Sequence, residues 1–351
     1  MLKKLFSVLF YKPPTEGSKF KSYVESEPYE EGFAEHYRTR LLPRVKYYEK
    51  KRIKALSVAR SRCLKSIPII IVLLGITVLA ILNIDSLGRG FSWVFYISVG
   101  MIGAIIVFIF SSIDKYKTSI KGRIFPRILE FTGDFEYKQN YKAPFAQYKK
   151  YDILPPFDPP ASFSEDYVKG TYNNVNIEFF EARLMRGAHF KGKKAVFNGV
   201  IAKISVNKKF SSKTVIRADK GSFGDWVSGR KLPENQEVVR LEDPKFDKLF
   251  NVYSNDQIEA RYLLTTTFME RLIEVEKAFG SQKIECSFYK QSLVMAIHLK
   301  KDWFEPGPIT KIEDFRDDSK KLLADINSIF NICDTLPVSY THLTLPTIYS
   351  V

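Results

Sequence analysis

Two long stretches without a charged residue constrain this chain more than any other feature. The first, residues 66–84, holds thirteen Ile, Leu or Val among its nineteen positions. As a helix that rises about 1.5 Å per residue, it would be about 28 Å long, enough to cross the hydrocarbon of a bilayer. The second stretch, residues 91–113, opens with aromatic residues typical of a membrane interface: Phe91, Trp93, Phe95 and Tyr96. The pattern predicts a transmembrane helical hairpin.

Two alternatives to this hairpin are disfavoured. Buried core helices of a water-soluble protein normally carry polar residues on one face, which these stretches lack. A signal peptide would lie near the N-terminus, whereas the first stretch begins at residue 66. At about −0.45 kcal/mol for each strongly apolar residue, thirteen such residues favour insertion of one span by roughly 6 kcal/mol.

The charges that flank the hairpin predict its orientation. Both outer flanks are densely basic, whereas the short loop between the spans carries only Asp85 and Arg89. By the positive-inside rule, both termini face the cytoplasm. The basic residues expected to contact anionic lipid, at about 1 kcal/mol each, are Lys50, Lys51, Arg52, Lys54, Arg60, Arg62, Lys65, Lys115 and Lys117.

The net charge of +15 would also suit a nucleic-acid ligand. Because the basic run adjoins a span, membrane topology already explains it. We therefore expect no nucleic-acid partner.

The rest of the sequence divides into four parts. Residues 1–65 are expected to form a basic helical segment, in which Pro43 breaks or kinks the helix. Residues 114–160 are interpreted as a helical connector and a Pro-rich linker. Residues 161–336 are expected to be a cytoplasmic α+β domain. Residues 337–351 resemble a translated sequencing adapter, so we expect an artefactual tail and a gene cut short before its natural end.

Alternation of apolar and polar residues predicts the strands of the soluble domain. Candidate strands lie at 175–179, 200–206, 214–217 and 238–241, and a hairpin through Lys290 and Gln291 joins 284–289 to 293–299. Capping boxes at Ser254/Gln257 and Thr267/Glu270 start helices at 257–264 and 268–279, and an apolar stripe predicts a closing helix over 315–333. The predicted fold class is α+β: a two-span transmembrane hairpin, then an antiparallel sheet with packed helices.

One run of residues in this domain resembles a known family. Residues 250–264, FNVYSNDQIEARYLL, followed by 268–272, are similar to the most recognisable motif of the bacterial DUF3137 proteins. Residues 165–170 and 196–199 also fit, as does the order of basic helix, two spans and C-terminal domain, so the resemblance extends over residues 30–336. DUF3137 proteins are bacterial membrane proteins without an established activity. The resemblance implies a multi-pass protein of the bacterial inner membrane and assigns no functional residues.

No pattern of residues predicts catalysis or metal binding. The histidines outside the tail, His36, His189 and His298, are far apart in the sequence, and no H-E-x-x-H, G-x-S-x-G, Walker or paired C-x-x-C motif occurs. The widely spaced cysteines Cys63, Cys286 and Cys333 match no disulfide or metal framework. We expect no enzymatic activity, no cofactor and no metal.

Two groups of residues are candidates for partner binding or for structure. Asp256, Glu259 and Arg261 lie near a predicted helix start, where negative charge is favourable. We interpret them as a helix start with an ion pair, and a binding site is the alternative. Trp226 and Trp303 lie in predicted loops and either anchor a partner or cap the edge of the core.

Three functions remain open. We expect a membrane-anchored cytoplasmic interaction or scaffold module, with the lipid bilayer and an unidentified protein as partners and a homo-oligomer as a further option. The second is an inner-leaflet lipid-binding domain with a basic rim at Lys203, Lys208, Lys209, Lys213 and Arg217. The third is an enzyme with an unrecognised site.

Overall fold

The computed structural model describes most of the chain in two compact units. The described residues are 8–10, 20–82, 92–187, 192, 194–206, 209–219, 235–280, 283–300, 303, 309 and 314–336. Trp226, His189, Lys208, the loop 83–91 and the tail 337–351 lie outside them. The first unit comprises Met1–Arg127 and Pro306–Asp318, and the second comprises Ile128–Glu305 and Ser319–Val351. We call them the helical unit and the sheet unit.

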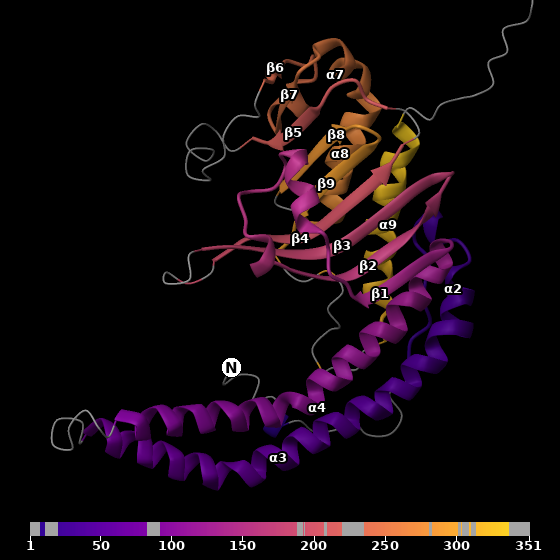
Figure 1. The fold of residues 1–351 in the computed structure, drawn as a ribbon. Coiled ribbons are helices and arrows are strands. Elements are labelled where there is room, and N and C mark those ends of the chain that lie inside the picture. Colours follow the sequence, from indigo (N-terminus) through magenta and orange to yellow (C-terminus); the bar gives the residue numbers. More distant parts are fainter. Residues whose placement is uncertain are drawn as a thin grey trace, which may run out of the picture. The chain divides into compact units, whose positions relative to one another are not determined.

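Two long antiparallel helices carry the apolar stretches (Figure 1). The helices are α3 (Leu42–Leu82) and α4 (Ser92–Thr132), each of 41 residues. Polar side chains join them at several levels. Thr77 Oγ1 donates to Ser98 Oγ at 2.8 Å, and Ser112 Oγ donates to the carbonyl oxygen of Ala55 at 3.2 Å. The hairpin therefore has internal hydrogen bonds as well as apolar packing.

The chain is already helical before α3. The short elements η1 (Pro28–Glu30), α2 (Phe33–His36) and η2 (Tyr37–Leu41), a π-helical stretch, lead into it. Pro43 is the second residue of α3 and does not break the helix, which was one of the two expected outcomes. The π-helical stretch directly before it shifts the hydrogen-bond register by one residue, which accommodates a residue without an N–H donor inside a continuous helix.

A segment from the second half of the sequence belongs to the helical unit. Ile309 packs with Leu56, Ala59 and Ile113. Further along the same segment, the Tyr37 hydroxyl donates to the carbonyl oxygen of Asp314 at 2.6 Å. These contacts attach Ile309 and Asp314 to the helices.

Within the described residues, the sheet unit contains one nine-stranded sheet in which every neighbouring pair is antiparallel. Its order is β1-β2-β3-β4-β9-β8-β5-β7-β6. The strands are β1 (Phe135–Asn140), β2 (Phe163–Tyr172), β3 (Val175–Arg186), β4 (Lys194–Ser205), β5 (Thr214–Ala218), β6 (Glu237–Val239), β7 (Phe250–Ser254), β8 (Lys283–Tyr289) and β9 (Ser292–His298). The predicted α+β class is confirmed.

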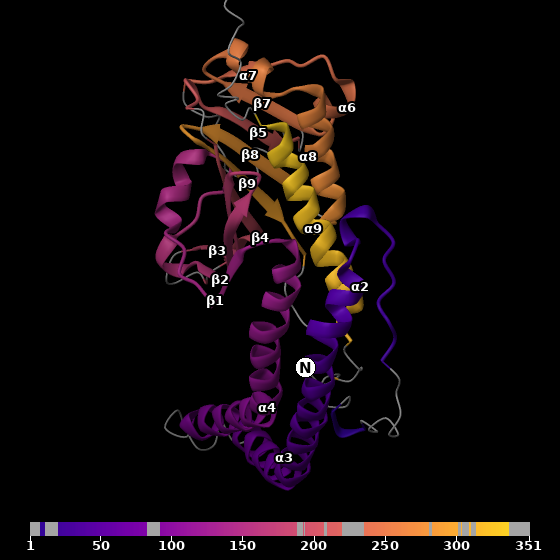
Figure 2. The same ribbon diagram turned by 90° about the vertical axis from the view of Figure 1, so that its right-hand side faces the viewer.

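Both faces of the sheet are covered. The helices α8 (Thr266–Ala278) and α9 (Arg316–Thr335) lie on one face (Figure 2). The 3₁₀ segment η4 (Phe145–Tyr151) packs on the other, against Phe180 and Ile201. The shorter elements are η5 (Pro159–Ala161), α6 (Pro244–Asp247) and α7 (Gln257–Leu263). Because neighbouring strand residues point to opposite faces, Phe180 contacts the η4 side, while Phe179 contacts Trp303.

Three local features differ from the sequence interpretation. The sheet begins at Phe135, within the range interpreted as connector and linker, and the aromatic residues of η4 in the same range supply part of the core. The predicted cap Ser254 is not the cap of α7; that position is Asp256, which accepts from the amides of Ile258 and Glu259. Thr265, and not Thr267, caps α8. The hairpin through Lys290 and Gln291 is present, with Lys290 at a φ of 56°.

Candidate functional site

The apolar stretches of α3 and α4 present their side chains outward. Only 11% of the most apolar window of either helix is buried within the protein. Ile71 is 62% exposed, Leu82 is 74% exposed and Val107 is 70% exposed. Both helices are long and apolar enough to cross a membrane. A water-soluble protein rarely leaves so continuous an apolar surface uncovered.

The basic residues predicted to contact lipid do not all face outward. Most of them, including Lys50, Lys54, Arg60 and Lys65, are exposed on α3. Lys115 is exposed and Lys117 is half-buried on α4. Lys51 is exposed, with Nζ 4.7 Å from the centre of the Tyr47 ring.

Arg52 and Arg62 have partners within the helical unit. Both Nε and Nη2 of Arg52 lie 2.7 Å from Glu49 carboxylate oxygens, and Nη1 donates to the carbonyl oxygen of Ile309. The Arg52 side chain is fully buried, so the expectation that it contacts lipid is wrong: it attaches residue 309 to α3. Arg62 donates to the carbonyl oxygen of Phe108 at 2.8 Å and thereby joins α3 to α4.

The short helix α7 carries the central part of the motif that suggested a family. Asp256 caps it, and Glu259 accepts hydrogen bonds from the Ser211 and Ser212 amides at 2.9 and 2.7 Å. Burial acts to raise the Glu259 pKa, but the hydrogen bonds from Ser211 and Ser212 outweigh it and hold the pKa below its usual range. Glu259 therefore stays ionised and attaches the segment before β5 to α7.

Arg261 does not join this carboxylate group. Its Nη2 donates to Gln257 Oε1 at 3.3 Å, one turn earlier on the same helix. The three residues Asp256, Glu259 and Arg261 thus have separate contacts. Asp256 stabilises a helix start and Glu259 a loop, while the ion pair expected for this group is not among the contacts of the described residues.

Trp303 belongs to the core and is not an exposed anchor. Its ring lies 5.2 Å from that of Phe179 and 5.3 Å from that of Phe279, between centres. Its indole Nε1 donates to Asp325 Oδ2 of α9 at 2.5 Å. Burial raises the pKa of Asp325 to about 7, although the hydrogen bond from Trp303 acts to lower it.

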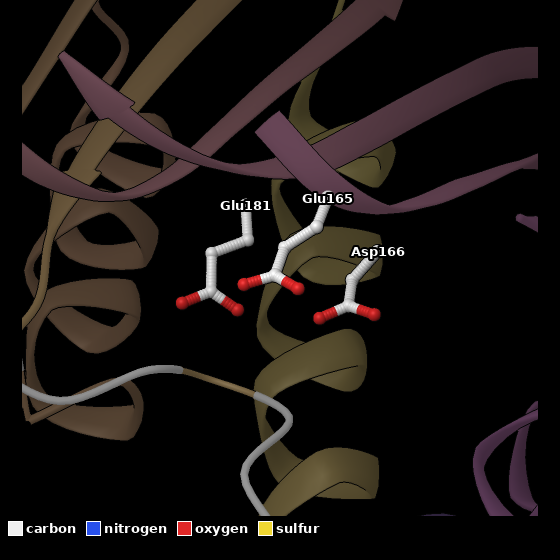
Figure 3. Close-up of side chains that lie close together, drawn as sticks. All are labelled: Glu165, Asp166 and Glu181. Carbon is white, nitrogen blue, oxygen red and sulfur yellow. The ribbon is translucent and has the colours of Figure 1, made fainter. Parts of the chain in front are cut away.

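Three acidic side chains meet where β2 and β3 pair (Figure 3). Glu165 and Glu181 are direct partners across the two strands, and an irregularity in register follows Glu165. There Asp166 adopts a φ of 54°, a conformation that aspartate tolerates better than most residues. One carboxylate oxygen from each of the three residues lies within 4.8 Å of the others. Asp166 and Glu181 are buried, and Glu165 is exposed.

Neighbouring groups donate hydrogen bonds to two of these carboxylates. The Tyr137 hydroxyl donates to Asp166 Oδ1 at 2.6 Å, and the Trp303 amide donates to Glu181 Oε1 at 3.2 Å. Burial, followed by the charge of Asp166, raises the Tyr137 pKa far above its usual range, so this phenol remains a donor.

Glu165 and Glu181 also line a hollow of about 440 Å³, together with Asn140, Ser164 and Arg183 among others. Three carboxylates could bind a hard divalent cation such as Mg²⁺ or Ca²⁺, whose preferred ligands are oxygens. An acidic cluster is by itself no evidence of a bound ion.

The comparisons with known proteins bear on the second half of the chain. Residues 195–338 match the family described as "Protein of unknown function (DUF3137)". The predicted resemblance to DUF3137 is confirmed over these residues. The match runs from β4 to the end of α9 and includes the α7 motif, whereas residues 165–170 and both apolar helices lie outside it.

Two further comparisons add little. No curated protein matches the sequence. One solved structure, "crystal structure of the mycobacterial trehalose monomycolate transport factor A, TtfA", is 10% identical, with a TM-score of 0.31, over 60% of this chain and 92% of that chain. At that TM-score the similarity supports no argument about fold or function.

The acidic cluster and Asp325 were not found from sequence. One sequence feature could have indicated the cluster: Glu181 follows Phe179 and Phe180 inside a strand of mostly buried apolar residues. The sequence does not reveal which strand pairs with it.

Proposed function

We propose that this chain is a membrane-anchored protein of the bacterial inner membrane whose sheet unit is a cytoplasmic interaction or scaffold module for another protein. One observation supports the proposal most: the apolar side chains of α3 and α4 are exposed over a length suited to a bilayer. Hydrocarbon would cover this surface, and the basic flanks of both stretches support a topology with both chain termini in the cytoplasm.

Cysteine labelling tests the orientation. Ser86→Cys, in the loop between the spans, should react with a membrane-impermeant maleimide in intact cells. Ser57→Cys, on an exposed position of α3 before the first span, should react only after the membrane is opened. The native cysteines are all buried, and burial raises the pKa of Cys286 and of Cys333, so background labelling should be low. Labelling of Ser57→Cys in intact cells would contradict the proposed topology.

Exposed apolar residues on α7 support a protein partner. Ile258 is 82% exposed and Tyr262, one turn later, is 58% exposed. They form an exposed apolar pair on a helix whose buried residues are Ala260 and Leu263. Exposed aromatic and aliphatic anchors of this kind are typical of protein interfaces.

Affinity purification of the full-length protein in mild detergent tests this part. We expect a partner in stoichiometric amount. The double variant Ile258→Asp/Tyr262→Asp should lose it. Phe163→Ser, which removes an exposed aromatic residue from β2, is the matched control and should retain it. Repeated purification without a partner would reject the interaction role.

Contacts of the basic rim weigh against the lipid-binding alternative. Lys203 Nζ lies 2.8 Å from Glu178 Oε1, and Lys213 forms an ion pair with Asp152. Arg217 donates to the carbonyl oxygen of Asp152 at 2.8 Å. Cations with such partners gain less from an anionic lipid surface than free ones would. We propose no catalytic role either, because Asp256 and Glu259 have the structural contacts described above.

A further inference from the structure

A basic hollow of about 400 Å³ lies in the helical unit, before the apolar stretch of α3. Its lining consists of Thr39, Arg40, Pro43, Arg44, Tyr47 and Arg127. Three of these six described residues are arginines, and none of the six is acidic. We call it the arginine hollow.

Two parts of the chain build this hollow. Arg40 lies in the π-helical stretch η2, and Arg44 follows one turn later on α3. Arg127 comes from the far part of α4, which returns beside the start of α3 because the two helices are antiparallel. The carbonyl oxygen of Arg127 lies 2.6 Å from His36 Nε2, which holds this part of α4 against α2.

Within the part of the chain that the structure describes, Arg40 and Arg44 lack the ion pairs that two other arginines of the same helices form. Arg38 and Arg52 each form an ion pair with a glutamate three residues earlier, Glu35 and Glu49, at 2.7 Å. The corresponding positions before Arg40 and Arg44 are Tyr37 and Leu41, which carry no charge.

Among the described residues, no carboxylate lies within ion-pair distance of Arg40 or Arg44. The two arginines are one turn apart, so their like charges destabilise the helix slightly. Lys51, which packs over the Tyr47 ring, adds a further cation at this end of the hollow. An anion bound there would relieve this repulsion.

We propose that the arginine hollow binds a soluble phosphate-bearing anion. Guanidinium groups match phosphate geometry with paired N–H donors, and the Tyr47 ring offers an exposed aromatic surface beside them. A hollow of this size lies within the range of small-ligand sites.

Distance along the helix favours a soluble anion over a lipid headgroup of the anchoring bilayer. Arg44 precedes Ser66, where the apolar stretch begins, by about 22 residues, or about 33 Å of helix. The headgroup layer extends only about 5–8 Å beyond the hydrocarbon. The same measure puts Lys50, Lys51 and Lys54, which the sequence led us to expect at the lipid, beyond that layer as well. This inference concerns the helical unit alone and does not depend on the partner proposed for the sheet unit.

Calorimetric titration of the full-length protein with pyrophosphate, in an uncharged maltoside detergent, tests the site. We expect binding that weakens at least tenfold in Arg44→Gln and in Arg40→Gln. Arg40 is exposed, so that variant should fold even if Arg44→Gln does not, and circular dichroism checks both. Arg38→Gln is the matched control: it removes the same charge two residues away, outside the hollow, and should change the affinity less than twofold.

The other outcomes are decisive as well. If pyrophosphate does not bind, or if Arg38→Gln weakens binding as much as Arg44→Gln, the site is overturned. A second titration compares nanodiscs of phosphatidylcholine alone with discs containing phosphatidylglycerol. We expect equal affinity in both. An affinity at least tenfold lower in the phosphatidylglycerol discs would mean that lipid headgroups occupy the hollow, and the assignment to a soluble anion would be wrong.

Discussion

The long helices α3 and α9 use apolar residues in opposite ways. Along α9 the buried residues recur at helical spacing and face the sheet, with Leu322, Ile326 and Ile329 among them. Along the apolar stretch of α3, most Ile, Leu and Val side chains remain exposed, although Leu73 is buried. The difference teaches that apolar content alone does not define a core helix. A polar face is typical of a helix that borders water, and α3 lacks such a face along its apolar stretch.

The strongest test of this comparison places charge in the α3 stretch. Each arginine near the centre of a span costs about 2.5–3.5 kcal/mol. Two of them, in Ile71→Arg/Leu74→Arg, should offset the roughly 6 kcal/mol that favours insertion of the span. We expect the protein to leave the carbonate-washed membrane fraction or to be degraded. Ile258→Arg/Tyr262→Arg, at exposed apolar positions of the sheet unit, should remain in that fraction. Wild-type protein found in the high-speed supernatant would remove the basis of the comparison.

The same substitution in the two helices should have unequal effects on stability. Ile326→Ala removes a fully buried side chain and leaves a cavity, so we expect it to cost the sheet unit about 2–5 kcal/mol of unfolding free energy. Ile71→Ala, on the exposed surface of α3, should leave the unfolding of the sheet unit unchanged. Thermal unfolding of full-length protein in detergent, followed by circular dichroism, measures both. Equal shifts would mean that the exposed surface of α3 is packed in the native protein.

The raised pKa of Asp325 predicts that the stability of the sheet unit depends on pH. Its pKa is about 7 in the folded state against 3.8 for an ordinary aspartate, so the folded protein binds the extra proton between these values. Stability should therefore fall as pH rises from about 4 to 7, and the loss is complete above 7. Since each pKa unit corresponds to about 1.4 kcal/mol, the effect is a few kcal/mol.

Asp325→Asn keeps an acceptor for the Trp303 indole but cannot ionise. We expect this variant to lose the pH slope between about 4 and 7 and to exceed the wild type in stability at pH 8. Unfolding midpoints measured at pH 5 and at pH 8 provide the comparison. A wild-type slope that persists in Asp325→Asn would assign the titration to another group.

The smallest expected effect concerns the start of α7. Asp256→Ala removes the acceptor for two amides and should cost about 1 kcal/mol. Asp256→Asn retains an acceptor oxygen and should lower the unfolding free energy by only a few tenths of a kcal/mol. A loss well above 1 kcal/mol in Asp256→Asn would indicate that the charge itself has a role that the cap does not explain.

Local patterns predicted much of this fold. The uncharged stretches indicated α3 and α4 because nothing in them suits water, and period-two alternation indicated β3, β4, β5 and the hairpin of β8 with β9. The capping residues were misplaced by two positions at both α7 and α8. Several polar residues near each helix start offer similar caps, and tertiary contacts decide between them.

What could not be predicted depends on pairing between distant segments. The meeting of Glu165, Asp166 and Glu181 requires both the β2–β3 register and the irregularity at Asp166. Arg52 was interpreted as a lipid contact because it stands in a basic run, but its carbonyl partner Ile309 is more than 250 residues away. The arginine hollow likewise needs the return of α4 beside α3.

The attachment of residues 306–318 to the helices has a practical consequence for dividing this protein. A truncation that keeps only the C-terminal half would separate Ile309 and Asp314 from Leu56, Arg52 and Tyr37. The fragment would then expose the Ile309 side chain and the carbonyl oxygens of Ile309 and Asp314 to water. In the intact chain, apolar residues cover this side chain and side-chain donors bind both carbonyl oxygens. No single cleavage point in the sequence separates the anchor from the remainder, so the two halves are expected to be made and studied together.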